Sequence, residues 1–206
     1  MIKIWGRKNS INVQKVLWCC DELDIPYQRI DVGAQPGDVD TAAYRKLNPN
    51  GLIPTIEDGE FILWESNSIL RYLASKYDDG NIWPTNPQAR ALADRWMDWQ
   101  LGTLWVEMRP MFIQLIRHSP DHRDQSVIDM AYRKTLAAMK LLDAHLGNHH
   151  HVAGERFTLG DIPVGAVTYR WMALPIERPD LVNLQNWYSR LAHRSAYRQH
   201  VMQPMS

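Results

Sequence analysis

Three short motifs near the start of the chain carry groups that could hold a small anionic ligand. Ser10 precedes a helical pattern, Ile53-Pro54 precedes a strand pattern, and Glu65-Ser66 opens a second helical pattern. A helix N-terminus has free backbone amides and the positive end of the helix dipole, and both attract an anion. The two helix starts are therefore candidate anion sites, and the serine hydroxyl at each could donate a further hydrogen bond.

Each motif also has a purely structural interpretation. Serine is a favoured helix N-cap, which would account for Ser10 and Ser66. Proline is common in turns that precede strands, which would account for Ile53-Pro54. Proline also lowers the cost of a cis peptide bond to about 0.5–1 kcal/mol, and a cis bond here would turn the backbone at Ile53 outward.

The elements around the first motif alternate between strand and helix. Apolar residues alternate with polar ones from Ile2, in a strand that stops at Gly6. From Val13 the apolar residues have helical spacing, and residues 27–32 have the pattern of a second strand. The sequence therefore predicts a strand, a helix and a strand, with Ser10 in the loop before the helix.

The other two motifs frame a predicted hairpin. Residues 53–57 and 61–64 are strand-like and flank Asp58-Gly59, a pair suited to the positive φ angles of a tight turn. Apolar residues on one helical face follow Ser66. Residues 1–78 thus have the order βαβ, a connecting stretch and ββα, which is typical of a thioredoxin-like domain.

The rest of the chain has the pattern of a second, helical domain. Residues 79–87 are rich in turn formers and form a predicted linker, and strand patterns are absent from residues 88–206. The first long helix of this domain contains Pro110, which predicts a kink. The predicted fold class is an α/β thioredoxin-like N-terminal domain plus an all-α C-terminal domain.

Composition argues against several classes of protein. Lys plus Arg and Asp plus Glu number 23 each, so no net charge attracts nucleic acid. No apolar run approaches the roughly 20 residues of a spanning helix and no leader pattern is present, so we expect no membrane partner and a cytoplasmic location. Adjacent Cys19 and Cys20 point in different directions on a helix, so they are poorly placed to share a metal ion. The run His149-His150-His151 has no accompanying cysteine or carboxylate motif, so we predict a solvated loop there and no metal.

Together, the order and spacing of these motifs resemble the cytosolic glutathione S-transferases. The motifs are Ser10, the segment Asn48-Pro49-Asn50-Gly51-Leu52-Ile53-Pro54, and Glu65-Ser66. The resemblance continues in Thr158-Leu159-Gly160-Asp161, which is similar to the family's capping box, so it spans nearly the whole chain. The position of Ser10, without an earlier tyrosine or a loop cysteine, is similar to the serine-type, theta- or beta-like enzymes of bacteria.

The resemblance implies that glutathione is the co-substrate. In the family the Ser66 position binds the γ-glutamyl carboxylate and the Glu65 position faces the ammonium group. The main chain of Ile53, before Pro54, pairs with the cysteinyl backbone of glutathione in a strand-like manner. One departure is Leu52, because many members carry a basic residue there that meets the glycyl carboxylate.

Thiol activation is the predicted catalytic step. A free cysteine thiol has a pKa of about 8.5, so the protein must stabilise the thiolate that attacks an electrophile. A hydroxyl donor and a helix N-terminus both stabilise the thiolate, which makes Ser10 the candidate catalytic residue.

Alternatively, Ser10 only caps the helix, and Asn9 or Asn12 donates the hydrogen bond to sulfur. In either case Asn12 is a predicted glutathione contact. Arg7 either adds positive potential or is a solvated surface charge.

The resemblance also implies a small, apolar electrophile held between the domains. Candidate lining residues on the first long helix of the second domain are Trp105, Met108, Arg109 and Phe112. A homodimer is expected, with Asp98 near its interface. Alternative functions are a non-catalytic binding protein with the same fold, or another glutathione-dependent activity such as isomerase, peroxidase or dehalogenase.

Overall fold

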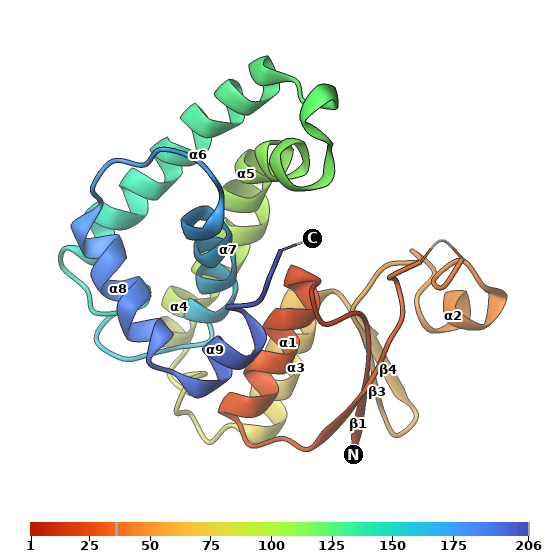
Figure 1. Ribbon diagram of the computed structural model, residues 1–206. Helices are drawn as coiled ribbons and strands as arrows, with labels where there is room; N and C mark the ends of the chain where they lie inside the picture. The colour runs from red at the N-terminus through yellow and green to blue at the C-terminus, as the bar shows by residue number, and fades with distance from the viewer. Residues whose placement is uncertain (36, 206) are drawn as a thin grey trace.

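The computed structural model describes residues 1–35 and 37–205, and its N-terminal part is built on a four-stranded sheet (Figure 1). The strand order is β2-β1-β3-β4. The strands are β1 (Ile2–Trp5), β2 (Tyr27–Ile30), β3 (Thr55–Asp58) and β4 (Phe61–Trp64). β1 pairs in parallel with β2 and antiparallel with β3, which confirms the predicted thioredoxin-like order.

The β3–β4 hairpin forms where the sequence predicts it. Asp58 pairs with Phe61, and the two strands run antiparallel. Gly59 in the turn has a φ angle of 64°, a conformation that a residue without a β-carbon adopts at low cost. The hairpin brings the end of β4 to the residues that begin the next helix.

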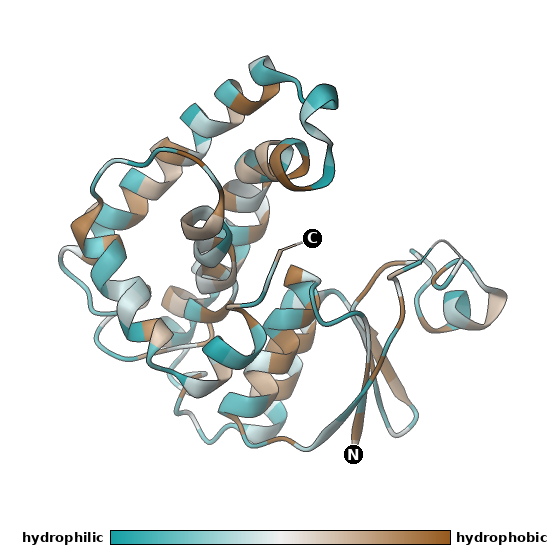
Figure 2. Ribbon diagram, in the orientation of Figure 1, coloured by the Kyte–Doolittle hydropathy of each residue, from teal (hydrophilic) through white to brown (hydrophobic). Residues whose placement is uncertain are grey.

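Two helices lie between the sheet and the helical part of the molecule (Figure 1). They are α1 (Ile11–Glu22) and α3 (Ser66–Tyr77), which pack against each other and carry extended apolar stretches (Figure 2). A short helix, α2 (Ala42–Leu47), lies on the far side of the sheet. The sequence predicts only a connecting stretch there, because six residues are too few to show a helical repeat.

Helices make up the second part of the chain. They are α4 (Pro87–Trp99), η1 (Gln100–Leu104), α5 (Trp105–Phe112), η2 (Ile113–Arg117), η3 (Pro120–His122), α6 (Gln125–Leu146), α7 (Asp161–Ala173), α8 (Val182–Ala192) and α9 (Ser195–His200). Pro110 lies inside α5, and the helical path continues through it with a π-helical segment, η1 or η2, on each side. None of the helices in residues 1–35 and 37–205 has both the length and the apolar character needed to cross a membrane.

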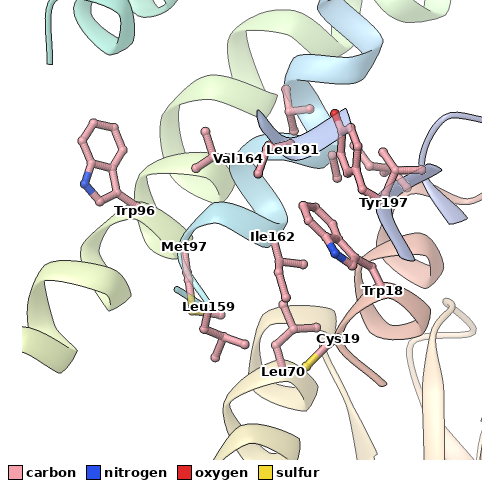
Figure 3. Packing of buried hydrophobic residues seen from close by; sticks show 14 of the residues in the cluster. Trp18, Cys19, Leu70, Trp96, Met97, Leu159, Ile162, Val164, Leu191 and Tyr197 are labelled. Carbon is pink, nitrogen blue, oxygen red and sulfur yellow. The ribbon is translucent and has the colours of Figure 1, made fainter. Parts of the chain in front are cut away.

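The two parts of the molecule share one core through α1. This helix packs against α3 on one side and against α7 and α9 on the other. The Trp18 ring of α1 is fully buried, with its centroid 4.7 Å from that of Tyr197 in α9 (Figure 3). A β-carbon on Gly165 of α7 would lie 2.7 Å from Leu191, so glycine permits this close approach of helices. The position of α1 therefore depends on both parts of the chain.

Asp161 anchors the start of α7. Its buried carboxylate accepts hydrogen bonds from the Thr158 amide (2.8 Å), the Val152 amide (3.1 Å) and the Trp187 indole (2.9 Å). The Thr158 hydroxyl donates to the same carboxylate, so only the Asp161 half of the predicted capping box is formed. The structural role predicted for this pair is confirmed.

The two cysteines are buried, and part of the histidine loop packs against the rest of the chain. Cys19 and Cys20 are buried free thiols, and burial raises the pKa of Cys20 to about 12. The histidine loop is less solvated than predicted, because the His149 ring stacks on His145 and His151 approaches Asp161. Within residues 1–35 and 37–205, no group of three or more His, Cys, Asp or Glu side chains is arranged to hold a metal ion.

Candidate functional site

A small cavity of about 50 Å³ lies where the sequence predicts a ligand site. Its walls come from the first turn of α1, the loop before β3 and the first turn of α3. The lining residues are Asn12, Asn48, Asn50, Leu52, Ile53, Pro54, Glu65 and Ser66. The structure therefore brings together all five of the predicted glutathione contacts, which come from three separate segments of the chain.

The loop before β3 is held by hydrogen bonds from two side chains, of which the sequence analysis named Asn48 but not Tyr44. The Leu52 carbonyl accepts hydrogen bonds from the Tyr44 hydroxyl and the Asn48 side-chain amide, both at 2.8 Å. The Ile53-Pro54 peptide bond is cis, as the proline allows. Leu52 itself is 63% exposed, at the rim of the cavity. Tyr44 belongs to α2, a helix that the sequence did not predict, so its hydrogen bond to the Leu52 carbonyl was not predicted either.

The start of α3 forms one end of the site. Glu65 occupies the N-cap with a φ angle of 71°, which is uncommon for a residue other than glycine, and its side chain makes no capping hydrogen bond. Ser66 is the first residue of the helix and is buried. The interpretation of Ser66 as an N-cap is therefore wrong, because that position belongs to Glu65. Ser66 lines the cavity, and the first turn of α3 has backbone amides without a partner inside the helix.

A buried cation lies beneath this end of the site. Lys15 of α1 is fully buried, and its ammonium group donates to Asn67 Oδ1 at 3.0 Å. Asn67 Nδ2 in turn donates to the Met97 carbonyl at 2.9 Å, which links α1, α3 and α4. Burial lowers the pKa of Lys15 to about 7, against a smaller raising effect from the Glu65 carboxylate. We call Lys15, Glu65, Ser66 and Asn67 the α3 end.

Lys15 could not be recognised from the sequence. Charged residues are normally solvated, and a lysine inside a helical pattern is ordinarily assigned to the exposed face. Here both faces of α1 are covered, by α3 and by α7 and α9, so Lys15 has no route to solvent. The only available signal was the density of apolar residues around it, which predicts burial of the helix but not of this side chain.

Ser10 is not among the residues that line the cavity, but it is two residues before Asn12, which does line it. Ser10 occupies the N-cap of α1, yet its side chain makes no capping hydrogen bond. The hydroxyl therefore has no capping function in this structure, which contradicts the purely structural alternative. Asn12, in the first turn of the same helix, lines the cavity. Arg7 is half-buried and donates to Asn9 Oδ1 at 2.7 Å and to the Gly33 carbonyl at 3.1 Å, so it is not a solvated surface charge.

The residues predicted to receive a second substrate lie on α5. Phe112 is buried and Trp105 is half-buried, with ring centroids 5.7 Å apart. Met108 has no exposed surface, and Arg109 is exposed to solvent. Asp98, expected near a dimer interface, forms an ion pair with Arg71 of the same chain.

A thioredoxin-like domain with a ligand cavity at its cis-proline loop, followed by a helical domain, defines the glutathione S-transferase fold. The family model for the "Glutathione S-transferase, N-terminal domain" matches residues 9–76, and the model for the "Glutathione S-transferase, C-terminal domain" matches residues 103–195. The chain belongs to the glutathione S-transferase family. The family resemblance and the fold class predicted from the sequence are thereby confirmed.

Individual relatives match over nearly the whole chain. Glutathione S-transferase GstB of Escherichia coli (strain K12) is 41% identical over 208 residues, which cover 100% of both chains. A crystal structure of the theta class glutathione S-transferase from Xanthomonas axonopodis pv. citri with glutathione bound is 45% identical, with a TM-score of 0.96 over 100% of this chain and 99% of that one. Bombyx mori glutathione transferase BmGSTD1 is 28% identical, with a TM-score of 0.86 over 97% and 92% of the two chains.

Proposed function

We propose that the protein is a glutathione transferase that binds glutathione in the cavity between α1 and α3 and activates its thiol through Ser10. The observation that carries this proposal is the convergence of Asn12, Ile53, Pro54, Glu65 and Ser66 on one cavity. The glutathione-bound theta class structure, which matches this chain over its full length, supports the same ligand. A small electrophile is the second substrate.

The γ-glutamyl group is proposed to bind at the α3 end. Its carboxylate would accept hydrogen bonds from the Ser66 hydroxyl and the free amides of the first turn, and the helix dipole favours this anion. The exposed carboxylate of Glu65 is available to the ligand's ammonium group. The backbone of Ile53 would pair with the cysteinyl residue, which directs the thiol toward the N-terminus of α1.

Ser10 is proposed to lower the pKa of the bound thiol. A hydroxyl that is not engaged in capping can donate a hydrogen bond to the thiolate, and the positive end of α1 favours the same anion. The thiol proton leaves to solvent before attack. The thiolate sulfur then forms a bond to the electrophilic carbon, and the leaving group departs with its electron pair.

Ultraviolet absorbance of the bound thiolate tests this function. The parent protein and the variants Ser10→Ala, Asn12→Ala and Ser66→Ala are titrated with glutathione over a range of pH. The parent is expected to bind glutathione with a thiol pKa below about 8.5, the free value. Absence of binding at millimolar glutathione would remove the transferase and leave a binding protein of this fold.

We also propose a cytoplasmic homodimer. Large apolar side chains remain exposed on β4, η1 and α5, at Phe61, Leu101 and Val106, and a partner subunit could cover them. Sedimentation equilibrium that gives the mass of a single chain would contradict the dimer, and cell fractionation tests the compartment.

A further inference from the structure

Three arginines from distant parts of the chain converge beside Ser10. Arg7 and Arg170 both donate to Asn9, at its side-chain oxygen (2.7 Å) and its carbonyl (3.3 Å). The guanidinium carbons of Arg170 and Arg117 lie 5.1 and 5.8 Å from the centroid of the Phe112 ring. We call Arg7, Arg117 and Arg170 the arginine cluster. It joins the loop that carries Ser10 to η2 and α7 of the helical domain.

The cluster has no acidic partner in the part of the chain that the structure describes. Other arginines, such as Arg29, Arg71 and Arg194, form ion pairs with carboxylates. The three clustered guanidinium groups form none within residues 1–35 and 37–205. The polar partners of Arg7 and Arg170 are carbonyl and amide oxygens, and Arg117 lies over the Phe112 ring. Arginine is well suited to bind carboxylate and phosphate groups, and clustered positive charge attracts anions.

Arg170 is the most unusual member. Its side chain is 3% exposed, and its Nε atom is buried with no hydrogen-bond partner. Burial lowers the pKa of Arg170 to about 10; the neighbouring Tyr169 acts to raise it, and repulsion by Arg117 and Arg7 acts to lower it further. Burial, with repulsion by Arg117, also lowers the pKa of Arg7. The buried Nε donor of Arg170 is left unsatisfied within the described part of the chain, which is costly in a folded protein.

The location of the cluster selects the kind of anion. Asn9, which both Arg7 and Arg170 hold, is the residue immediately before Ser10. Phe112, against which Arg117 and Arg170 lie, belongs to the helix predicted to receive the second substrate. The γ-glutamyl carboxylate is proposed to bind at the α3 end of the cavity, so it is not the anion for which the cluster is placed.

We propose that the second substrate carries an anionic group of carboxylate size, which the arginine cluster binds while its electrophilic carbon meets the glutathione thiolate. This inference rests on the proposed function and replaces the apolar electrophile expected from the sequence with an anionic one, such as a halogenated carboxylic acid. For an aryl or alkyl halide the carbon–sulfur bond forms, the carbon–halogen bond breaks, and halide leaves with the bonding electrons. Phe112 supplies the apolar surface for the remainder of the molecule.

Equilibrium binding with a matched pair of unreactive compounds tests the inference. The protein is first saturated with S-methylglutathione, whose thioether cannot react, and then titrated with nitrobenzoate or nitrobenzamide. These differ only in a carboxylate against a carboxamide. The parent is expected to bind the benzoate about tenfold more tightly, and Arg117→Gln and Arg170→Gln should reduce this preference to less than about threefold. Arg133→Gln, which removes an exposed arginine of α6, should leave it unchanged.

A kinetic ratio provides the second readout and is insensitive to the fraction of folded protein. The ratio of kcat/KM for a chloronitrobenzoate to that for the corresponding chloronitrobenzamide should fall about tenfold in Arg117→Gln. Because Arg170 is buried, Arg170→Lys accompanies Arg170→Gln and should restore part of the preference.

Two outcomes would overturn the inference. Equal binding of benzoate and benzamide by the parent would show that the cluster does not recognise the carboxylate. If the arginine variants lost binding or activity equally for both compounds, the cluster would act in stabilising the thiolate or the folded structure and not in recognising the carboxylate. Failure of S-methylglutathione to bind is a separate result, which would remove the proposed function and, with it, the basis of the inference.

Discussion

The α3 end of the site and the end that carries Ser10 and the arginine cluster, which we call the sulfur end, each contain a buried basic side chain. In the described part of the chain, only one of the two, Lys15 at the α3 end, has a carboxylate close enough to affect its pKa. At the α3 end the ammonium group of Lys15 donates to Asn67, and the Glu65 carboxylate lies near enough to affect its pKa. At the sulfur end Arg170 is buried with an unpaired Nε and with two other arginines as neighbours. The buried lysine of the α3 end thus has its partners before a ligand binds, whereas the sulfur end has an excess of positive charge.

The difference indicates that the two ends of the site bind different parts of the substrates. An end whose buried lysine already has partners can hold a constant group, and the γ-glutamyl group is the same in every turnover. An end with unpaired positive charge favours anions, and both the thiolate and an anionic electrophile belong there. The variants below perturb the two ends separately.

The largest effect is expected at Ser10. Ser10→Ala removes the hydroxyl donor to the thiolate and should lower kcat/KM by about a hundredfold or more, as loss of a single oxyanion donor does in other enzymes. The measurement uses a neutral electrophile, so that the arginine cluster does not contribute. Asn12→Ala is the matched variant from the same helix turn; a larger loss for it would transfer thiol activation to Asn12.

At the α3 end, Ser66→Ala should weaken glutathione binding. Loss of a hydrogen bond to a charged group corresponds to about 1.5–3 kcal/mol, or a ten- to hundredfold rise in Kd. Calorimetric titration with glutathione gives this constant directly. Ser68→Ala, two residues further along α3, is the control, and equal weakening in both variants would show a general loss of helix structure instead.

Lys15 should make stability depend on pH. Its pKa of about 7 in the folded protein lies below the ordinary value of 10.5, so between these values the unfolded chain binds a proton that the folded protein does not. The contribution of Lys15 to the unfolding free energy therefore rises with pH in this window, by at most about 1.4 kcal/mol per pH unit.

Urea unfolding of the parent and of Lys15→Met isolates this contribution. Methionine keeps most of the buried stem, so the difference between the two proteins should change steadily from pH 7 to pH 10. Subtraction removes the opposite trend expected from Cys20 and Tyr27, whose pKa values are raised. A difference that is constant with pH would show that Lys15 is charged throughout or reaches solvent.

The smallest effect is expected at the rim. Leu52→Arg places a cation where many family members have a basic residue, beside the predicted position of the glycyl carboxylate. Since Leu52 is largely exposed, the added pair should tighten glutathione binding only about two- to fivefold, and less so at high salt. Leu52→Gln has a similar length without the charge, and an equal gain for it would exclude an electrostatic cause.

The secondary-structure elements could be predicted from the sequence better than the positions of the buried basic side chains could. Strand alternation, the Asp58-Gly59 turn and the start of a helix at Ser66 are local signals, and each appears in the structure. Helix α2 was missed because it is short and capped by Thr41 rather than marked by an apolar repeat. Pro110, at which the sequence predicts a kink, lies inside α5 with π-helical segments on both sides.

The buried cations could not be predicted because they depend on packing between distant segments. Lys15 loses solvent only when α3, α7 and α9 enclose α1. Arg170 meets Asn9 across more than 160 positions of sequence, and neither residue has a pattern that indicates the other. Local motifs identified the ligand site, but its electrostatics arise from the tertiary fold.

The pH dependence of glutathione affinity, compared with that of S-methylglutathione, tests the central claim most directly. If the sulfur end stabilises the thiolate, glutathione should bind more tightly as pH rises from the bound thiol pKa toward the free value of about 8.5. S-methylglutathione has no ionisable thiol and should lack this increase, while any effect of Lys15 is common to both ligands. Parallel curves for the two ligands would contradict thiolate stabilisation at Ser10.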